Sequence, residues 1–387
     1  MLLNNREIIT NNAKQEINIK HILDLRDFPN LSYSDKFTKN FEDIVGDAEV
    51  DIVAEAMGGL EPAYTFVKRC LEAGKSVVTS NKELVAAKGA ELLKIAKEKN
   101  VNFLFEASVG GGIPILRPMA QCLAANKITE IFGILNGTTN FILTKMICDN
   151  FGFEEALKLA QDLGYAERIP DADVLGHDAC RKICILASLA FGKHVYPEYV
   201  YTRGITEITL EDVDLADKLG YVIKLIGHAK DLENGKIAAT VYPALVCKDN
   251  MLAGVRDVYN AVTVCGNAVD DTFFYGKGAG KLPTASAVVA DIIDCAVHLE
   301  KRKPLFWEDS AENFVETKEN LLTRLYIKLG NTDENTKSEI KALFGDVDII
   351  CSNNKLAFIT DAAIEKELTA KLGTLKNGKV EALINVI

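Results

Sequence analysis

The segment from Gly164 to Lys182 constrains the fold and chemistry of this chain more than any other. It reads GYAERIPDADVLGHDACRK and gathers acidic residues and a lysine around a tight turn that leads into a helix. A helix beginning near Val174 places Asp178 and Lys182 on one face, one turn apart. An isolated pair of this kind is usually a solvated ion pair on a surface. Residues 183–191, however, read ICILASLAF, and because a helix that is apolar all round is buried, we expect its first turn to face a cleft.

Composition excludes several classes of protein. A chain of 387 residues can hold two or three domains, and 48% hydrophobic and 26% charged residues are typical of a soluble globular protein. A net charge of -11 argues against a surface for nucleic acid or for an anionic membrane. No apolar run reaches the roughly 18 residues that span a bilayer, and the N-terminus lacks the order of a signal peptide. The nine cysteines are scattered without a C-x-x-C pair, which favours reduced thiols in a cytoplasmic protein.

The first hundred residues alternate between strand and helix patterns, which predicts a parallel sheet with helices on both faces. The expected strands span 17–23, 50–56, 76–79 and 101–105, and the expected helices span 2–10, 61–73 and 81–100. Ligands of such sheets bind beyond the carboxyl ends of the strands. Three segments occupy that edge: Gly58-Gly59, Ser80-Asn81-Lys82 and Glu106-Ala107-Ser108.

One motif of dinucleotide-binding folds is missing from the front of the chain. No G-x-G-x-x-G follows a strand in the first forty residues. We therefore expect an incomplete doubly wound sheet that lacks roughly one βα unit, through a truncated record or a start codon assigned too far downstream. A sheet with this gap should bind its cofactor poorly.

The rest of the chain mixes strands and helices. We expect a helix from Gly110 to about Asn126, a strand over 128–135, and a turn at NGTTN (136–140) that caps another helix. Segments 205–208, 238–244 and 263–264 read as strands of a second sheet. The apolar helix expected over 283–299 could pack back on the first domain, and 301–304 reads as a linker. The tail reads strand (322–329), helix (335–344), strand (347–351), strand (356–359), helix (362–372), strand (380–386).

Spaced motifs along the chain resemble those of the homoserine dehydrogenases. The signature A-x-x-x-G-Y-x-E followed by P-x-x-D-x-x-G-x-D-x-x-x-K is matched by Ala160, Gly164, Tyr165, Glu167, Pro170, Asp173, Gly176, Asp178 and Lys182. Ile169 departs from the small polar residue that the family usually has before the proline. Three further stretches are similar to the family's: VVTSNK (77–82), EASVGGGIP (106–114) and GKGAG (276–280) before PTASAV.

The resemblance implies an α/β protein of three parts. These are a truncated, Rossmann-like NAD(P)-binding domain (1–108), an α+β catalytic and dimerisation domain (109–304) and a small βαββαβ tail (315–387) that resembles an ACT domain. The D-x-P-G ligand turn of ACT domains is replaced by Gly330-Asn331-Thr332-Asp333, so a purely structural, dimerising tail fits as well as an amino-acid sensor.

The resemblance also implies the reaction, the NAD(P)-dependent interconversion of L-homoserine and L-aspartate 4-semialdehyde in threonine, methionine and isoleucine biosynthesis. Lys182 would be the proton donor, a role that suits a desolvated lysine, while Asp178 and Glu167 would hold the substrate amino group. Lys82 would lie beside the nicotinamide and share the acid–base role. Asp173 would orient one of the two lysines.

The same resemblance assigns two non-protein groups and a partner. The cofactor would contact Lys82, Ser80, Gly58, Gly164 and Gly280. NADP is slightly preferred over NAD, because Arg26 follows the second strand, although Asp24 and Asp27 beside it suit a free ribose hydroxyl. A monovalent cation such as sodium would bind main-chain oxygens of Glu106, Val109, Gly111 and Ile113. A homodimer through the central sheet is expected, without nucleic acid or membrane.

Two other functions are compatible with parts of the sequence. A regulatory, non-catalytic homologue that binds amino acids is favoured by the missing glycine loop and opposed by Lys82, Glu167, Asp178 and Lys182. A dehydrogenase of the same fold acting on another amino acid, such as aspartate, is opposed by the match over 164–182.

Overall fold

The computed structural model describes residues 1–303, 305–330, 333–352 and 354–387. The chain forms two compact units, each described here by itself. The first unit contains residues 1–125, 188–196 and 279–311, and the second contains 126–187, 197–278 and 312–387. Residues 109–125, 188–196 and 279–303 of the expected catalytic segment therefore belong to the first unit. Pro304 of the expected linker and Asn331 and Thr332 of the expected tail turn lie outside the described residues.

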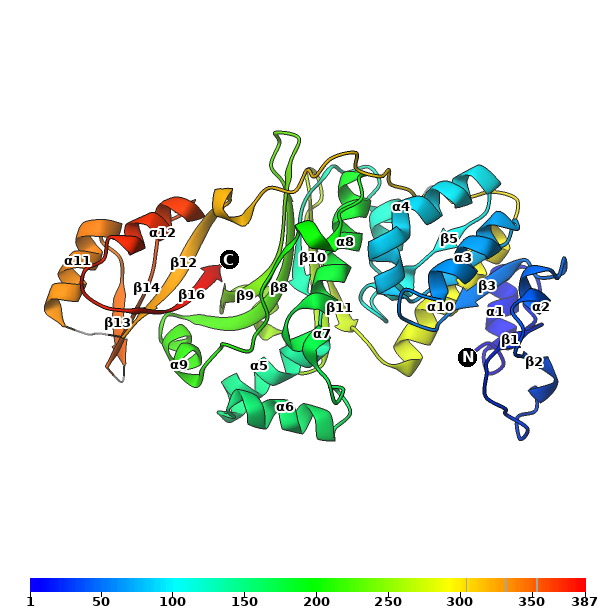
Figure 1. Ribbon diagram of the computed structural model, residues 1–387, viewed down its shortest axis with the longest axis horizontal. Coiled ribbons are helices and arrows are strands. Elements are labelled where there is room, and N and C mark those ends of the chain that lie inside the picture. The colour runs from blue at the N-terminus through cyan, green and yellow to red at the C-terminus, as the bar shows by residue number, and fades with distance from the viewer. Residues whose placement is uncertain (304, 331–332, 353) are drawn as a thin grey trace. The chain divides into compact units, whose positions relative to one another are not determined.

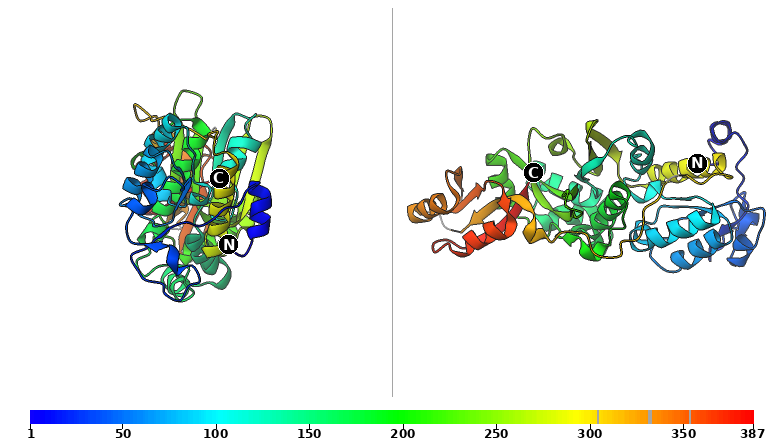
Figure 2. Two further views of the ribbon diagram at one scale, coloured as in Figure 1. Left: turned by 90° about the vertical axis from the view of Figure 1, so that its right-hand side faces the viewer. Right: turned by 90° about the horizontal axis from the view of Figure 1, so that it is seen from above.

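A three-stranded parallel sheet organises the first unit (Figure 1). Its strands, in spatial order, are β3 (Ile52–Glu55), β4 (Ser76–Thr79) and β5 (Phe103–Leu104). The helices α3 (Ala63–Glu72) and α4 (Lys82–Lys99) cover one face, and α10 (Lys281–Val297) covers the other (Figure 2). This confirms the expected βαβ pattern and the packing of the helix predicted over 283–299 against the first sheet.

Local sequence explains the ends of α4. The side chain of Asn81 accepts a hydrogen bond from Leu84 N at 3.0 Å, which caps the first turn. Asn100 ends the helix in the left-handed conformation, with φ of 54°. All four residues of β4 are buried, as expected of a central parallel strand.

Three expectations for the first unit were inaccurate. The strand expected over 17–23 is reduced to β1 (Ile22–Leu23), which pairs with β2 (Phe37–Thr38) in a separate two-stranded sheet. The helix expected over 2–10 is α1 (Arg6–Ala13), and a short helix, α2, spans Glu42–Val45. The helix expected from Gly110 covers only 116–122 and ends in a π-type turn, because Pro118 has no N–H and Leu123 N bonds to Pro118 O, five residues back.

A single large mixed sheet organises the second unit. Its main path runs β11-β10-β6-β8-β9-β16-β12-β14-β13, with β7 beside β9 and β15 beside β12. The strands are β6 (Ile128–Ile134), β7 (Tyr201–Thr202), β8 (Tyr221–Asp231), β9 (Ile237–Cys247), β10 (Tyr259–Gly266), β11 (Asp270–Lys277), β12 (Leu322–Leu329), β13 (Ile349–Ser352), β14 (Lys355–Ile359), β15 (Ala363–Ile364) and β16 (Val380–Val386). The helices are α5 (Gly137–Asp149), α6 (Phe153–Asp162), α7 (Asp171–Val174), α8 (His177–Phe191, which ends in the first unit), α9 (Leu210–Lys218), α11 (Glu334–Phe344) and α12 (Glu365–Gly373).

The strand predicted over 205–208 is wrong, and the helix predicted from Val174 begins later. Ile205 N bonds to Val174 O at 2.9 Å, so this segment packs against the end of α7 and joins no strand. Gly176, with φ of 87°, separates α7 from α8. Strands β8 and β11 were not anticipated from the sequence.

The tail has the predicted βαββαβ order from β12 to β16, except that the two-residue strand β15 lies between β14 and α12 where the helix was expected to begin. Asn385 and Val386 of β16 pair in parallel with Ala244 and Leu245 of β9, so the tail sheet continues the central sheet. Its own apolar core lies between the strands and α11 and α12, and includes Ile327, Ile340, Leu356, Phe358 and Leu368. The likeness to an ACT domain stays a prediction.

Candidate active site

A buried acid–base pair lies at the start of α8. Lys182 Nζ is 2.7 Å from Asp178 Oδ2 and donates a second hydrogen bond, also of 2.7 Å, to Leu135 O. The two residues are only 7% and 4% exposed. The spacing predicted from sequence therefore produces a desolvated ion pair, in which each charge feels the other more strongly than in water.

Asn136 connects this pair to a second carboxylate, and sequence reasoning did not select it as a site residue. Its Nδ2 donates to Asp173 Oδ1 at 2.6 Å and to Asp178 Oδ2 at 2.9 Å, while its Oδ1 accepts from Thr139 N and caps α5. Burial, and then the charge of Asp178, raise the pKa of Asp173. The NGTTN motif indicated that Asn136 caps a helix. The bridge between Asp173 and Asp178 could not be predicted in this way, because it depends on contacts between segments that are distant in the sequence.

Glu167 and Gly164 lie on the loop before α7. Glu167 is exposed, and its main-chain oxygen accepts from Gln161 Nε2 at 3.2 Å. Gly164 has φ of 74°, a conformation that favours glycine. The loop is anchored to α5, because Thr138 Oγ1 donates to Tyr165 O at 2.7 Å.

The predicted cofactor residues of the first unit follow the carboxyl ends of its parallel strands. Ser80 and Lys82 are half-buried, and Lys82 is in the first turn of α4. Gly58 and Gly59 have φ of 77° and 71°, and a Cβ on either would meet no atom within 4 Å. This open turn fits a ligand that approaches the backbone closely. Gly280, with φ of 121°, is the N-cap residue of α10.

Glu55, which sequence reasoning overlooked, supports this edge. It is 5% exposed, accepts a hydrogen bond from Thr79 Oγ1, and accepts from Met57 N at 2.7 Å and Gly58 N at 3.3 Å. A buried carboxylate therefore ties β4 to the glycine turn after β3. The position of this acidic residue at the end of an apolar strand is the sequence feature that could have identified it as a site residue.

The side chains expected near the cofactor ribose pair with one another. Arg26 donates through Nε and Nη2 to Asp24 at 3.0 and 2.8 Å, and this guanidinium holds the pKa of Asp24 at about 2. Lys39 pairs with Asp27 at 2.8 Å.

The glycine-rich loop 106–113 is fixed at both ends. Gly110 and Gly111 have positive φ, and Gly110 O accepts from Ile113 N at 2.9 Å. The Glu106 carboxylate accepts from the N–H groups of Ile115, Leu116 and Arg117 at 2.6, 2.9 and 2.7 Å. Main-chain carbonyls in such a turn are the oxygen donors that a hard cation prefers, so the loop fits the predicted ion.

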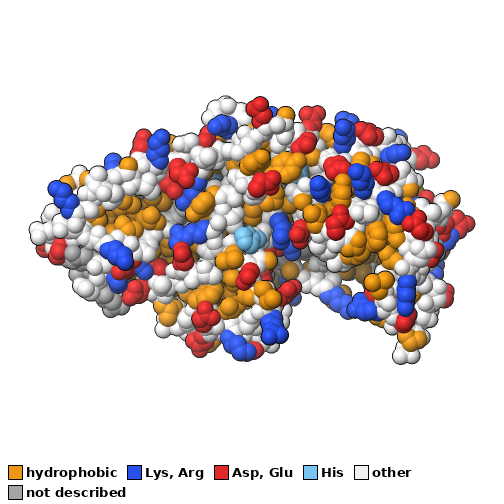
Figure 3. All heavy atoms as spheres, viewed as in Figure 1, with side chains coloured by type: hydrophobic (Ala, Val, Ile, Leu, Met, Phe, Trp, Pro, Cys, Tyr) orange, Lys and Arg blue, Asp and Glu red, His pale blue; other side chains and the backbone are white. Residues whose placement is uncertain are grey.

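No helix in the described parts of the chain has both the length and the apolar character needed to cross a membrane. On the face shown in Figure 3, acidic and basic side chains are interspersed.

The first unit has the architecture of a nucleotide-binding α/β domain, a parallel sheet with an open glycine turn at its carboxyl edge. The second unit, described by itself, holds a buried lysine–aspartate pair. Residues 6–106 match the family model for the homoserine dehydrogenase NAD-binding domain, and residues 114–293 match the homoserine dehydrogenase model. The chain belongs to the homoserine dehydrogenase family, which consists of oxidoreductases.

Relatives match at different lengths. The homoserine dehydrogenase of Helicobacter pylori is 38% identical over 392 residues, covering 97% of this chain and 91% of that protein. That of Bacillus subtilis is 48% identical over 256 residues, covering 66% of this chain and 59% of that protein, which is less than two thirds of its length. A crystal structure of a homoserine dehydrogenase from Thiobacillus denitrificans superposes with a TM-score of 0.91 at 38% identity, covering 100% of this chain and 94% of that one.

Proposed function

We propose that this chain interconverts L-homoserine and L-aspartate 4-semialdehyde with a nicotinamide dinucleotide. The observation that carries the proposal is the buried Asp178–Lys182 pair, with Asn136 bridging Asp178 to Asp173. The substrate is an amino acid with a reacting oxygen, and it needs an anion for its ammonium group and a proton donor for the oxygen. This cluster contains both.

Lys182 transfers the proton to or from the substrate oxygen in this proposal. In the unliganded pair, the Asp178 carboxylate stabilises the lysine ammonium. When the substrate ammonium binds Asp178, that carboxylate is shared between the substrate ammonium and Lys182. Leu135 O keeps the amine in place by accepting one of its hydrogens. Asp173 adds negative charge beside Asp178, and Glu167 on its exposed loop contributes a further carboxylate for the amino group.

The cofactor supplies the hydride acceptor or donor when it is bound. Lys82, Ser80 and Gly58 at the carboxyl edge of the first sheet would contact it, with Gly164 and Gly280. A related archaeal homoserine dehydrogenase is described in complex with NADPH, at 30% identity and a TM-score of 0.58. NADP is the slightly preferred coenzyme. Its 2′-phosphate would have to draw the Arg26 guanidinium from Asp24.

The loop 106–113 is proposed to bind a monovalent cation such as sodium through main-chain oxygens of Glu106, Val109, Gly111 and Ile113. The left-handed glycines in the loop support this proposal. We also propose a cytoplasmic homodimer that associates through the central sheet, with the ACT-like tail as a sensor or as a structural element. Nine cysteines scattered without a C-x-x-C pair suit a reducing compartment.

Purified protein tests the activity directly. We expect NADPH to form from NADP and L-homoserine, followed by absorbance, and L-aspartate to give no comparable rate. NADPH binding detected by fluorescence without turnover of homoserine would reject the proposed reaction. Turnover of a different amino acid at a higher kcat/KM would reject the substrate.

A further inference from the structure

A closed ring of hydrogen bonds joins the two ends of the glycine-rich loop to α10. Asp291 Oδ2 on α10 accepts from Glu106 N at 2.8 Å, and Asp291 Oδ1 accepts from the Arg117 guanidinium. Arg117 N in turn donates to Glu106 Oε2 at 2.7 Å. Glu106 begins the loop and Arg117 follows its return, so the ring closes around it.

We propose that Asp291 is a positioning residue that holds the loop 106–113 in the conformation needed for its main-chain oxygens to bind a cation. This inference rests on the proposed cation site. Because the peptide unit is planar, holding Glu106 N–H fixes the orientation of the Phe105–Glu106 peptide at the entry to the loop. The Glu106 carboxylate fixes the return at Ile115 and Leu116.

The burial of the two carboxylates supports this role. Glu106 is 5% exposed and Asp291 is 2% exposed. Charges are costly to bury, and hydrogen bonds offset part of that cost. The Glu106 carboxylate accepts from three main-chain N–H groups that follow the loop, and Asp291 accepts from Glu106 N and from the Arg117 guanidinium. A cation that replaces its water with several carbonyls binds more tightly to a loop that is already ordered, since less ordering entropy is lost on binding.

Asp294, one turn further along α10, provides a matched control. It also pairs with Arg117, at 3.3 Å, but its other contacts are His298 Nδ1 at 3.0 Å and Lys303 Nζ at 3.2 Å. Both aspartates thus hold the same guanidinium, and Asp291 alone of the two is bonded to Glu106 N. Replacing either aspartate by asparagine therefore weakens a contact with Arg117, whereas only the replacement of Asp291 weakens the contact with Glu106 N.

Hydrogen exchange of the loop amides in the full-length protein tests the positioning role. Asp291→Asn keeps the side-chain volume but offers one oxygen where two donors, Glu106 N–H and Arg117, now bind separate oxygens. We expect amides of residues 106–113 to exchange about tenfold faster in Asp291→Asn than in wild type, and within about twofold of wild type in Asp294→Asn. Unchanged exchange in Asp291→Asn overturns the proposal, as does equal acceleration in both variants.

A sodium titration links the loop to the cation. Trp307 is the single tryptophan and packs edge-on against Phe105, with ring centroids 5.4 Å apart, so its emission reports on the loop entry. At constant ionic strength in choline chloride, we expect half-saturation by sodium to need about tenfold more salt in Asp291→Asn than in Asp294→Asn. If the two variants reach half-saturation at the same sodium concentration and Asp291→Asn is only less thermostable, the proposal is overturned, and Asp291 then only stabilises the fold. A wild-type protein that gives no sodium response rejects the cation site itself, and loop exchange then decides the role of Asp291.

Discussion

The ammonium of Lys182 and the carboxylate of Asp178 lie 2.7 Å apart at one-turn spacing on α8, where both side chains are almost fully buried. The pair is neutral as a whole, which is how a buried lysine and aspartate are tolerated together. In the proposed reaction, a substrate with an ammonium group of its own adds a positive charge beside this neutral pair. The carboxylate of Asp178 thus fixes the position of the Lys182 amine and is also the proposed partner of the substrate ammonium.

Removing this amine should abolish most of the turnover. We predict that Lys182→Ala lowers kcat by about two to four orders of magnitude, the usual worth of a positioned acid–base group. The control is Lys218→Ala, because Lys218 pairs with Asp214 at the same spacing, at 2.6 Å, on the exposed surface of α9. Steady-state kinetics on both variants, with circular dichroism to verify folding, makes the comparison. Near-normal kcat in Lys182→Ala would remove it from the mechanism.

The bridging amide of Asn136 should affect substrate binding more than folding. Asn136→Ser keeps an N-cap residue for α5 but removes the Nδ2 donor shared by Asp173 and Asp178. A hydrogen bond to a charged group is worth about 1.5–3 kcal/mol, so we predict a KM for homoserine raised about tenfold or more.

Comparison of two variants separates the roles of Asn136. Asn136→Ala should show the same rise in KM and lose about 1 kcal/mol of additional stability with the cap. If the serine variant binds homoserine normally, the amide serves only the helix.

Sequence patterns predicted the elements whose determinants are local. Asn81 and Asn136 mark the helix starts that they cap, and the spacing of Asp178 and Lys182 specifies their pairing. The contacts that the patterns missed join distant segments. Asn136 reaches Asp173 across 37 residues, and Ile205 follows the end of α7 instead of a strand. Periodicity carries no information on such partners.

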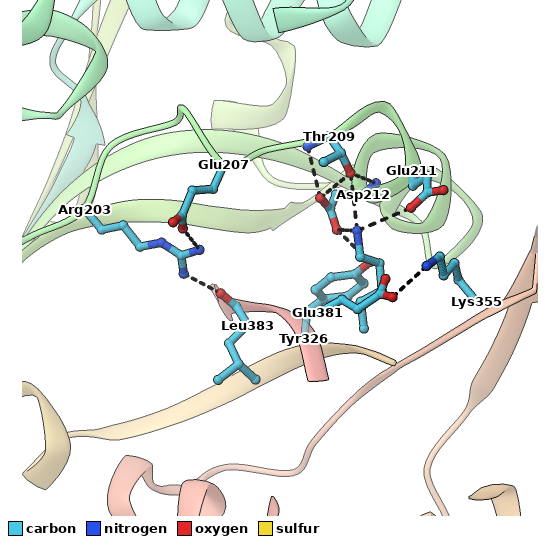
Figure 4. A network of polar contacts seen from close by, with 10 residues as sticks. Arg203, Glu207, Thr209, Glu211, Asp212, Tyr326, Lys355, Glu381 and Leu383 are labelled. Carbon is cyan, nitrogen blue, oxygen red and sulfur yellow. Dashed lines mark hydrogen bonds and ion pairs between the residues drawn. The ribbon is translucent and has the colours of Figure 1, made fainter. Parts of the chain in front are cut away.

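A second buried ion pair fastens the tail to the rest of the second unit. Lys328 of β12 lies 2.9 Å from Asp212 of α9, and the two are 3% and 1% exposed. Asp212 also accepts from Thr209 N at 3.0 Å, which completes a capping box at the start of α9 (Figure 4). The same carboxylate therefore organises a helix and anchors a strand of the tail.

Lys328→Met should strongly destabilise the protein, because it leaves Asp212 buried without its cation. We predict a loss of about 3–5 kcal/mol in the free energy of unfolding. Lys355→Met is the control: its partner Glu381 is 2.6 Å away and both side chains are partly exposed, so about 1 kcal/mol or less is expected. Urea denaturation of wild type and of each variant, followed by circular dichroism, gives the two losses in the free energy of unfolding. Equal losses would show that the Lys328 pair is no more important than the partly exposed one.

The buried Lys224 should make stability depend on pH in a direction opposite to that of most lysines. It is 2% exposed, donates to Val255 O at 2.5 Å and Asn140 Oδ1 at 3.1 Å, and burial lowers its pKa to about 8 from the ordinary 10.5. Between these two values the unfolded chain holds a proton that the folded chain has released. Stability from this site must therefore rise with pH through that window and be constant well below it.

The measurement compares wild type with Lys224→Met, which cannot titrate, by urea unfolding at about pH 7.5 and about pH 9.5. We expect the wild type to gain stability relative to the variant at the higher pH. Lys230→Met, which removes a half-exposed lysine of the same strand, should show no such change relative to wild type. A difference between wild type and Lys224→Met that stays the same at both pH values would mean that Lys224 keeps its proton when folded, held by the two oxygens that it contacts.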